Sequence, residues 1–130
     1  MSKTEIRTDK SYKTAGPYVQ AVQVTKGKTV YTSGILGRDK DGKLVDKADV
    51  GAQSRQCLEN IRHMIEEAGG TLKDLVRLNV FISHVKHYEA MNAVRKEMLA
   101  GIAFTSVTVV AQMIDPHGLV EMDGIAEIGG

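Results

Sequence analysis

Hydrophobic and polar positions alternate with two different periods along the chain. Between Asp49 and Ala68 the apolar residues recur every three to four positions, while charged residues fall between them. This pattern predicts an amphipathic helix, and the pair Gly69-Gly70 is expected to end it. In LVRLNVFIS, at 75–83, apolar and polar residues alternate with a period of two, which predicts a half-buried strand.

The second half of the chain predicts one more helix and two more strands. The helix is expected at about 86–99, with Ser83 as its N-cap, and its apolar stripe contains Tyr88, Met91, Val94 or Arg95, and Met98. Strands are expected at 104–112 and 119–128.

Before the first helix, the chain reads as a hairpin followed by a polar loop. Two short apolar runs flank TKGK at 25–28, which predicts a β-hairpin. Asp41-Gly42 marks a turn, with Leu44 and Val45 as a possible short strand after it.

One mixed sheet with both helices on the same face would bury the helix stripes, so the predicted fold is an α+β two-layer sandwich. Val30, Val80, Val107 and Val109 cannot all face the helices. A second apolar sheet surface is therefore expected, and self-association would cover it.

Composition narrows the class of protein. The 130 residues, 42% of them hydrophobic, suit a single domain over 1–130. The net charge of +1 and the absence of long basic runs predict no binding to nucleic acid or to a membrane surface. No stretch is long and apolar enough to cross a membrane, and the polar first residues favour a cytoplasmic location.

Few residues suggest chemistry by their pattern alone. No phosphate-loop, dinucleotide or serine-hydrolase motif occurs. His84 and His87 have a spacing that could bind a metal, but no further ligand accompanies them, so no metal is expected. Cys57 lies on the apolar stripe of the first helix, where a thiol keeps its proton. Glu121 interrupts the apolar run LVEMDGIA, where a carboxylate is either paired or used in chemistry.

Several segments together resemble the RidA/YjgF family, the reactive intermediate imine deaminases also known as L-PSP endoribonucleases. They are GPYVQAV at 16–22, YTSG at 31–34, the long stretch at 53–83, YEAMNAV at 88–94 and LVEMDGIA at 119–126. The resemblance implies a chorismate-mutase-like fold assembled as a homotrimer, with small-molecule ligand clefts between subunits. It also implies hydrolysis of enamines and imines to a carbonyl compound and ammonia without a cofactor.

The resemblance also carries over site residues, position by position. The family's glutamate, which positions water, corresponds to Glu121, and the cleft tyrosine and serine correspond to Tyr18 and Ser33, beside Gly34. The helix asparagine corresponds to Asn92.

One position departs from the family pattern. Thr105 stands where the arginine that grips the substrate carboxylate is usual, and Ser106 and Val107 follow it in the expected cleft wall. A hydroxyl offers one neutral donor, whereas a guanidinium can make two charge-assisted bonds, so efficient hydrolysis of 2-aminoacrylate is not expected. Arg38, close in sequence to Ser33, is considered as a substitute cation.

Three functions follow as hypotheses. The first is a divergent hydrolase of imines, enamines or related reactive metabolites, with Glu121 orienting the attacking water. The second is a non-catalytic trimer that binds a small metabolite in the same cleft. The third, RNA cleavage, is disfavoured by the charge balance.

Overall fold

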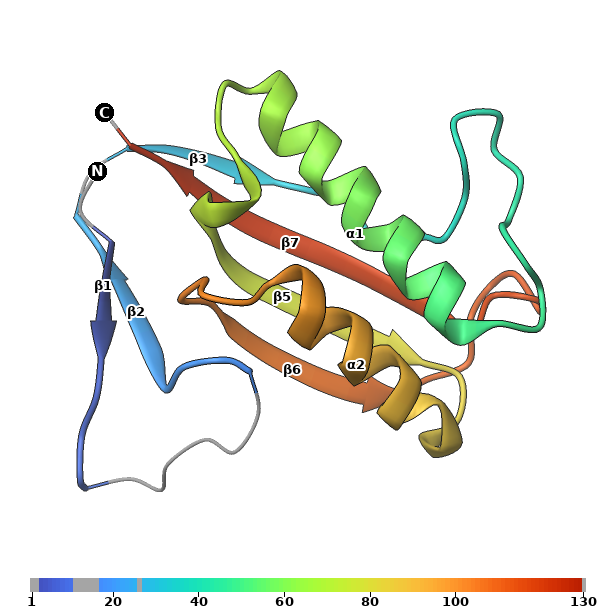
Figure 1. Ribbon diagram of the computed structural model, residues 1–130. Helices are drawn as coiled ribbons and strands as arrows, with labels where there is room; N and C mark the ends of the chain where they lie inside the picture. Colours follow the sequence, from blue (N-terminus) through green and yellow to red (C-terminus); the bar gives the residue numbers. More distant parts are fainter. Residues whose placement is uncertain (1–2, 11–16, 26, 130) are drawn as a thin grey trace.

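Two helices pack on one face of a five-stranded sheet, as the computed structural model in Figure 1 shows. The structure describes residues 3–10, 17–25 and 27–129. The helices are α1 (Val50–Glu67) and α2 (Tyr88–Met98). The strands of this sheet are β3 (Lys28–Tyr31), β4 (Ile35–Leu36), β5 (Leu75–Ile82), β6 (Thr105–Val110) and β7 (Val120–Ile128). The predicted α+β class is confirmed.

The sheet is mixed, in the order β3-β7-β5-β6, and β4 also pairs with β7. Strands β5 and β6 run parallel and are joined by α2, whereas β7 is antiparallel to β3, β4 and β5. The last strand in the chain is therefore central in the sheet, and β6 forms one edge.

Helix α1 matches its predicted range because both of its ends carry the expected signals. The side chain of Asp49 accepts a hydrogen bond from the Ala52 amide at 3.0 Å and caps the first turn. After Glu67 the chain turns through Gly69, which has a φ of 96°. The buried side of the helix contributes Cys57, Leu58, Ile61 and Ile65 to the core.

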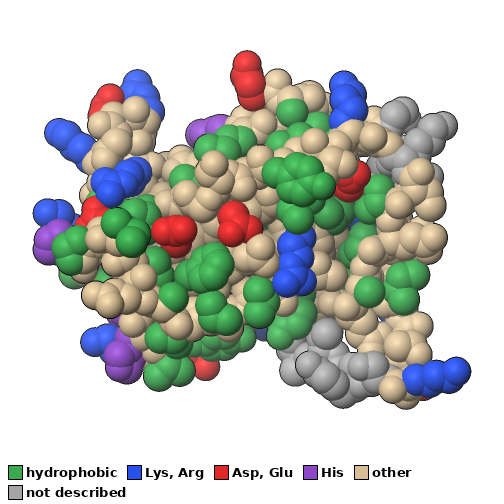
Figure 2. Space-filling model, turned by 180° about the vertical axis from the view of Figure 1, so that it is seen from behind, with side chains coloured by type: hydrophobic (Ala, Val, Ile, Leu, Met, Phe, Trp, Pro, Cys, Tyr) green, Lys and Arg blue, Asp and Glu red, His purple; other side chains and the backbone are tan. Residues whose placement is uncertain are grey.

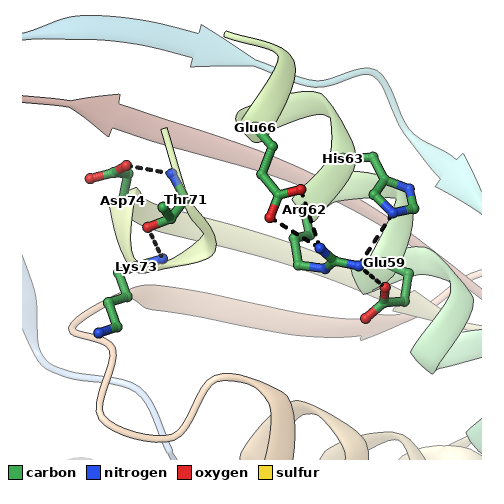
Figure 3. A network of polar contacts seen from close by, with 7 residues as sticks. All are labelled: Glu59, Arg62, His63, Glu66, Thr71, Lys73 and Asp74. Carbon is green, nitrogen blue, oxygen red and sulfur yellow. Dashed lines mark hydrogen bonds and ion pairs between the residues drawn. The ribbon is translucent and has the colours of Figure 1, made fainter. Parts of the chain in front are cut away.

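Polar contacts hold the exposed side of α1 and the turn after it (Figure 3). Arg62 donates to Glu66 at 3.0 Å and to Glu59, and these hydrogen bonds raise the pKa of Arg62. In the 3₁₀ turn at Leu72–Asp74, Thr71 and Asp74 form a capping box. These contacts are local to the helix surface and the turn.

The start of α2 differs from the prediction. Ser83 is not the cap; its amide donates to the Leu119 carbonyl at 3.0 Å instead. The Nδ1 atom of His84 accepts from the Lys86 amide at 3.0 Å and caps a 3₁₀ turn, Val85–His87, which leads into the helix. The helix pattern could not distinguish these two neighbouring caps, because both side chains offer an acceptor.

The predicted hairpin across residues 25–28 is wrong. Strand β2 (Ala21–Val24) pairs with β1 (Lys3–Ile6) in a separate two-stranded sheet, while β3 pairs with β7. Gly27, with a φ of 134°, redirects the chain between the two sheets. Alternating residues specify a strand but not its partner, and β1 was not expected at all.

The expected strand at Leu44 and Val45 is reduced to isolated contacts. Leu44 forms a single β-bridge with Arg38, and the Val45 amide donates to the Gly37 carbonyl at 2.9 Å. The chain between Arg38 and Leu44 therefore folds back toward the end of β4, but these contacts do not lengthen the strand.

The two faces of the sheet divide as the valine pattern predicts. Val30 packs against the core and Val80 is fully buried under the helices, whereas Val107 and Val109 lie on the opposite face and are 41% and 42% exposed. We call this opposite face the open face; it carries Arg77, Asn79, Phe81, Thr105, Val107, Val109, Glu121, Asp123 and Ile125. Figure 2 shows hydrophobic side chains gathered there with acidic and basic ones among them.

Candidate functional site

A buried arginine lies between α2 and the edge strand β6. Arg95 is 1% exposed. Its Nε and Nη2 atoms donate to Asn92 Oδ1 at 3.2 and 2.8 Å, and Nη1 donates to the hydroxyls of Ser106 at 3.0 Å and Thr108 at 2.9 Å. A longer bond of 3.5 Å joins Nη2 to the hydroxyl of Tyr88.

Aromatic rings complete the surroundings of Arg95. Its guanidinium carbon lies 5.5 Å from the ring centre of Tyr18 and 6.0 Å from that of Tyr88, so both rings make cation–π contacts. Tyr18 reaches this position because its neighbour Val19 donates a backbone hydrogen bond to the Phe104 carbonyl at 2.9 Å, just before β6. The N-terminal segment is thereby held against the start of the edge strand.

The positive charge of Arg95 has no acidic partner among the residues that the structure describes. Every oxygen that accepts from it is neutral. Burial lowers the pKa of the guanidinium, and the two tyrosines offset part of that effect. A guanidinium keeps its proton even so, and the site therefore contains a buried positive charge without an acidic partner in the described part of the chain.

Three residues expected in the cleft gather around this charge. Asn92 and Ser106 accept hydrogen bonds from Arg95, and Tyr18 stacks over it. Ser106 also donates to the Leu78 carbonyl at 2.7 Å, which fixes its hydroxyl against β5. These residues form a polar cluster on the helix side of the sheet, at its free edge.

Three further expected site residues, Thr105, Val107 and Glu121, lie on the open face. Thr105 is in register with Arg77, and its hydroxyl donates to the Val76 carbonyl at 3.0 Å. Val107 follows on the same face, and Glu121 pairs with Phe81, four positions further along β5. Thr105 on β6 and Glu121 on β7 are separated by two strand spacings across the sheet and by four residues along it. Their Cα atoms are therefore about 16 Å apart within one chain.

Glu121 lies close to the chain at Gly34. A Cβ atom at Gly34 would come within 2.5 Å of Glu121 Oε2, so any larger residue here would require this carboxylate to move. Among the described residues, the side chain of Glu121 has no hydrogen-bond or ion-pair partner. Burial and the negative charge of Glu121 raise the pKa of Cys57 to about 12. Its carboxylate oxygens therefore stay available to a ligand or to water.

Ser33 and Arg38 lie before and after the short strand β4. Ser33 is exposed, and its carbonyl accepts from the hydroxyl of Thr32 at 3.0 Å. Arg38 forms an ion pair with Asp115 at 2.6 Å and donates to the Gly42 carbonyl at 3.0 Å. Its guanidinium thus ties two loops together, and its role as a substitute cation stays a prediction.

A second arginine lies on the open face itself. Arg77 Nε donates to Asn79 Oδ1 at 3.0 Å, and Asn79 Nδ2 donates to Asp123 Oδ1 at 2.7 Å. The result is a polar row across β5 and β7, next to Thr105. Unlike Arg95, Arg77 has a carboxylate nearby, through the side chain of Asn79.

A hollow of about 520 Å³ lies beside Tyr18. Its described lining consists of Glu5, Arg7, Thr8, Asp9, Tyr18, Val19 and Gln20. Tyr18 thus contributes both to this lining and to the surroundings of Arg95. The described residues contain no cluster of three or more side chains arranged to bind a metal, and none of their helices is long and apolar enough to cross a membrane.

Two helices over one face of a mixed sheet, with polar side chains at its free edge, define a small α+β class of protein. The chain belongs to the Endoribonuclease L-PSP family, whose model matches residues 8–128, and thus to the RidA/YjgF proteins.

Relatives and solved structures agree with this assignment. The chain is 32% identical to a RutC family protein of Pyrococcus abyssi, over 97% of this chain and 98% of the relative. It is 33% identical to the 3-aminoacrylate deaminase RutC of Acinetobacter baylyi, over 86% and 87%. The crystal structure of the Rid family protein YyfB from Yersinia pestis superposes with a TM-score of 0.84 at 26% identity, covering 98% and 100%.

Arg95 was not singled out by the sequence. The helix pattern allowed either Val94 or Arg95 on the apolar stripe, and the structure buries both. The position of a charged residue on the apolar stripe of the helix is the one signal in the sequence that points to Arg95. Helical spacing alone does not distinguish a buried arginine from a surface one.

Proposed function

We propose that this protein is a divergent hydrolase of imines, enamines or related small reactive metabolites, with Glu121 orienting the attacking water. The observation that carries the proposal is the carboxylate of Glu121 on the open face, which has no partner in the described part of the chain and lies beside Gly34. A relative named as a 3-aminoacrylate deaminase supports the same reaction class.

In the proposed reaction, water adds through its oxygen to the imine carbon while the nitrogen gains a proton. In the tetrahedral intermediate the hydroxyl proton then moves to the nitrogen, the carbon–nitrogen bond breaks, and ammonia leaves as the carbonyl forms. The net reaction converts an imine and water into a carbonyl compound and ammonia. Glu121 accepts a proton from the water and returns it to the nitrogen, so neither a cofactor nor a metal is required.

We place the reaction between copies of the chain, in a homotrimer. Thr105 and Glu121 are too far apart within one subunit to contact the same small molecule, whereas a neighbouring copy on the open face could bring them together. The exposed valines on that face supply apolar surface for such an interface. Tyr18, Ser33, Asn92, Thr105, Ser106 and Val107 then line the cleft.

The assay is ammonia release from freshly generated imines of several amino acids. The wild-type protein is expected to exceed the uncatalysed rate, and Glu121→Gln is expected to lower its rate about a hundredfold or more. Glu127→Gln is the matched control, because Glu127 lies on the same strand and face but bonds to Thr29. If the wild-type rate equals the uncatalysed rate for every imine, the proposed hydrolase activity is wrong.

A second function, binding without turnover, is favoured by one observation. The Thr105 hydroxyl is already committed as a donor to the Val76 carbonyl, so this position offers a ligand no strong donor. In that case Glu121→Gln would alter ligand affinity, and ammonia release would match the uncatalysed rate in both proteins.

A further inference from the structure

Strands β2 and β3, on either side of Gly27, each have one edge to which no other strand is paired. Among the residues that the structure describes, β2 pairs with β1 alone and β3 pairs with β7 alone. Figure 1 shows that β2 and β3 diverge from their connection and do not lie alongside each other. Each strand therefore presents a row of backbone N–H and C=O groups with which a further strand could pair.

The free edge of β2 lacks the features that usually protect an exposed strand edge. Its sequence, Ala-Val-Gln-Val, contains neither a charged residue nor a proline. Its partner β1 carries Lys3 and Glu5, and such charged side chains suit the outermost strand of a sheet. Within this pair, β2 is therefore the strand whose composition favours a neighbour on its second side.

The free edge of β3 is also suited to pairing. Thr29, Val30 and Tyr31 are β-branched or aromatic, and the one charged residue, Lys28, stands at the start of the strand. Tyr31 is 74% exposed although its ring is large. A strand beside β3 would remove part of this ring from water, which favours association.

The two edges match in their pattern of apolar and polar residues. In an antiparallel arrangement with Val22 opposite Val30, Gln23 lies opposite Thr29. The valine pair then falls on the helix-covered face, because Val30 packs against the core. The polar pair falls on the other face, where Thr29 bonds to Glu127. A slip by one residue would reverse the faces of β2, so this register is favoured.

Contacts within the chain hold β2 away from its own β3. The Val19 amide donates to the Phe104 carbonyl at 2.9 Å, just before β6, and β6 and β3 are opposite edges of the sheet. A strand beyond β3 would lie four strand spacings from β6, about 19 Å away. Ala21 follows Val19 by only two residues, which span at most about 7 Å. While the Val19 contact remains, a strand on β3 must come from another copy.

We propose that β2 of one chain pairs with the free edge of β3 in a second copy, so that the N-terminal pair of strands is exchanged between subunits. The hairpin that the local sequence predicts would then form between two chains. Because four residue pairs make only a short ladder, the exchange accompanies the open-face contact of the proposed homotrimer and does not replace it.

The test introduces two cysteines, Gln23→Cys and Thr29→Cys, into one chain. Both positions are exposed, and opposite Cα atoms of antiparallel strands lie about 4.5–5.5 Å apart, which suits a disulfide. After mild oxidation, more than about half of the chains are expected to run as linked dimers or trimers on a non-reducing gel. Reduction should return them to monomers.

Two controls define the background. In the pair Gln23→Cys and Lys28→Cys, the second cysteine is also exposed but points to the other face of β3, so the linked fraction should fall at least about fivefold. The wild type should form no linked species, because its Cys57 is fully buried.

Three results would overturn the exchange. They are a disulfide within one chain, which shows an ordinary hairpin; no disulfide at all; and equal linkage in the control pair. If the double variant does not fold, chains with Gln23→Cys alone are co-expressed with differently tagged chains carrying Thr29→Cys alone. A linked species with both tags is then expected, and its absence would equally overturn the proposal. Because no turnover is measured, failure of the hydrolase assay leaves this test unaffected.

Discussion

Glu121 and Arg95 are both ionisable side chains that lie against the sheet, but their environments differ in kind. Arg95 is held by five hydrogen bonds and two aromatic rings, which fix its position and leave its charge uncompensated. Glu121 has space beside Gly34 and no partner among the described residues. A rigid cation suits recognition of a fixed group, whereas a movable carboxylate suits proton transfer.

At the same scale, Cys57 makes stability depend on pH. Burial and the charge of Glu121 raise the pKa of its thiol from an ordinary 9.0 to about 12. The unfolded chain therefore loses this proton at lower pH than the folded protein. The contribution to stability is complete below about pH 9 and is lost as the pH rises from 9 to 12.

We expect the free energy of unfolding to fall by about 1 kcal/mol between pH 9 and pH 10 because of this thiol alone. Urea titrations of the wild type and of Cys57→Ala at both pH values measure the difference. The variant is expected to be less stable at each pH but to lose less between them. Identical losses in the two proteins would mean that Cys57 has an ordinary pKa when folded.

At the scale of elements, α1 holds two loops through one buried side chain. Gln53 Nε2 donates to the carbonyls of Asp46 at 3.0 Å and His117 at 3.3 Å, and its Oε1 accepts from the Leu119 amide at 2.9 Å. These loops precede α1 and β7, so Gln53 links the entry of the helix to the entry of the central strand.

Gln53→Leu should lower the free energy of unfolding by about 2–4 kcal/mol, because it leaves buried backbone groups without partners. Gln56→Leu is the matched control. Gln56 lies one turn further along α1, and within the described residues its side chain bonds only to the side chain of Asn60, so a loss below about 1 kcal/mol is expected. Chemical denaturation measures both. Equal losses would show that the loop contacts of Gln53 contribute nothing specific.

The sequence predicted elements better than it predicted their partners. The helix at 50–67 and the strand at 75–82 have periodic burial that leaves little choice of conformation. The pairing of β2 with β1 depends on contacts between residues far apart in the chain, which no local pattern encodes. The candidate site divides in the same way: the resemblance supplied Glu121 and Asn92, whereas Arg95 needed the packing of α2 on β6.

At the scale of the whole molecule, the open face is the surface that a neighbouring copy would cover. Val107 and Val109 lie there beside the polar row of Arg77, Asn79 and Asp123. Apolar area favours association, and a buried polar row restricts how two copies can be placed, because a shifted arrangement would leave its groups unpaired.

If the proposed trimer forms through this face, Val109→Lys is expected to shift the protein to monomer in sedimentation velocity experiments. A lysine in the middle of the interface would have to be buried without a partner. Ile114→Lys is the control, since Ile114 is 98% exposed in a loop and a charge there should leave assembly unchanged. A Val109→Lys protein that sediments like the wild type would place the interface elsewhere.

The central position of β7 also constrains the order in which the molecule can form during synthesis. Strands β3, β4 and β5 all pair with β7, yet β7 follows every one of them in the chain. A growing chain can form α1 early, but β3 and β4 have no sheet to join until Val120–Ile128 has been made. Newly made chains therefore expose strand edges until their final strand arrives, and slow synthesis of the last segment would prolong their risk of aggregation.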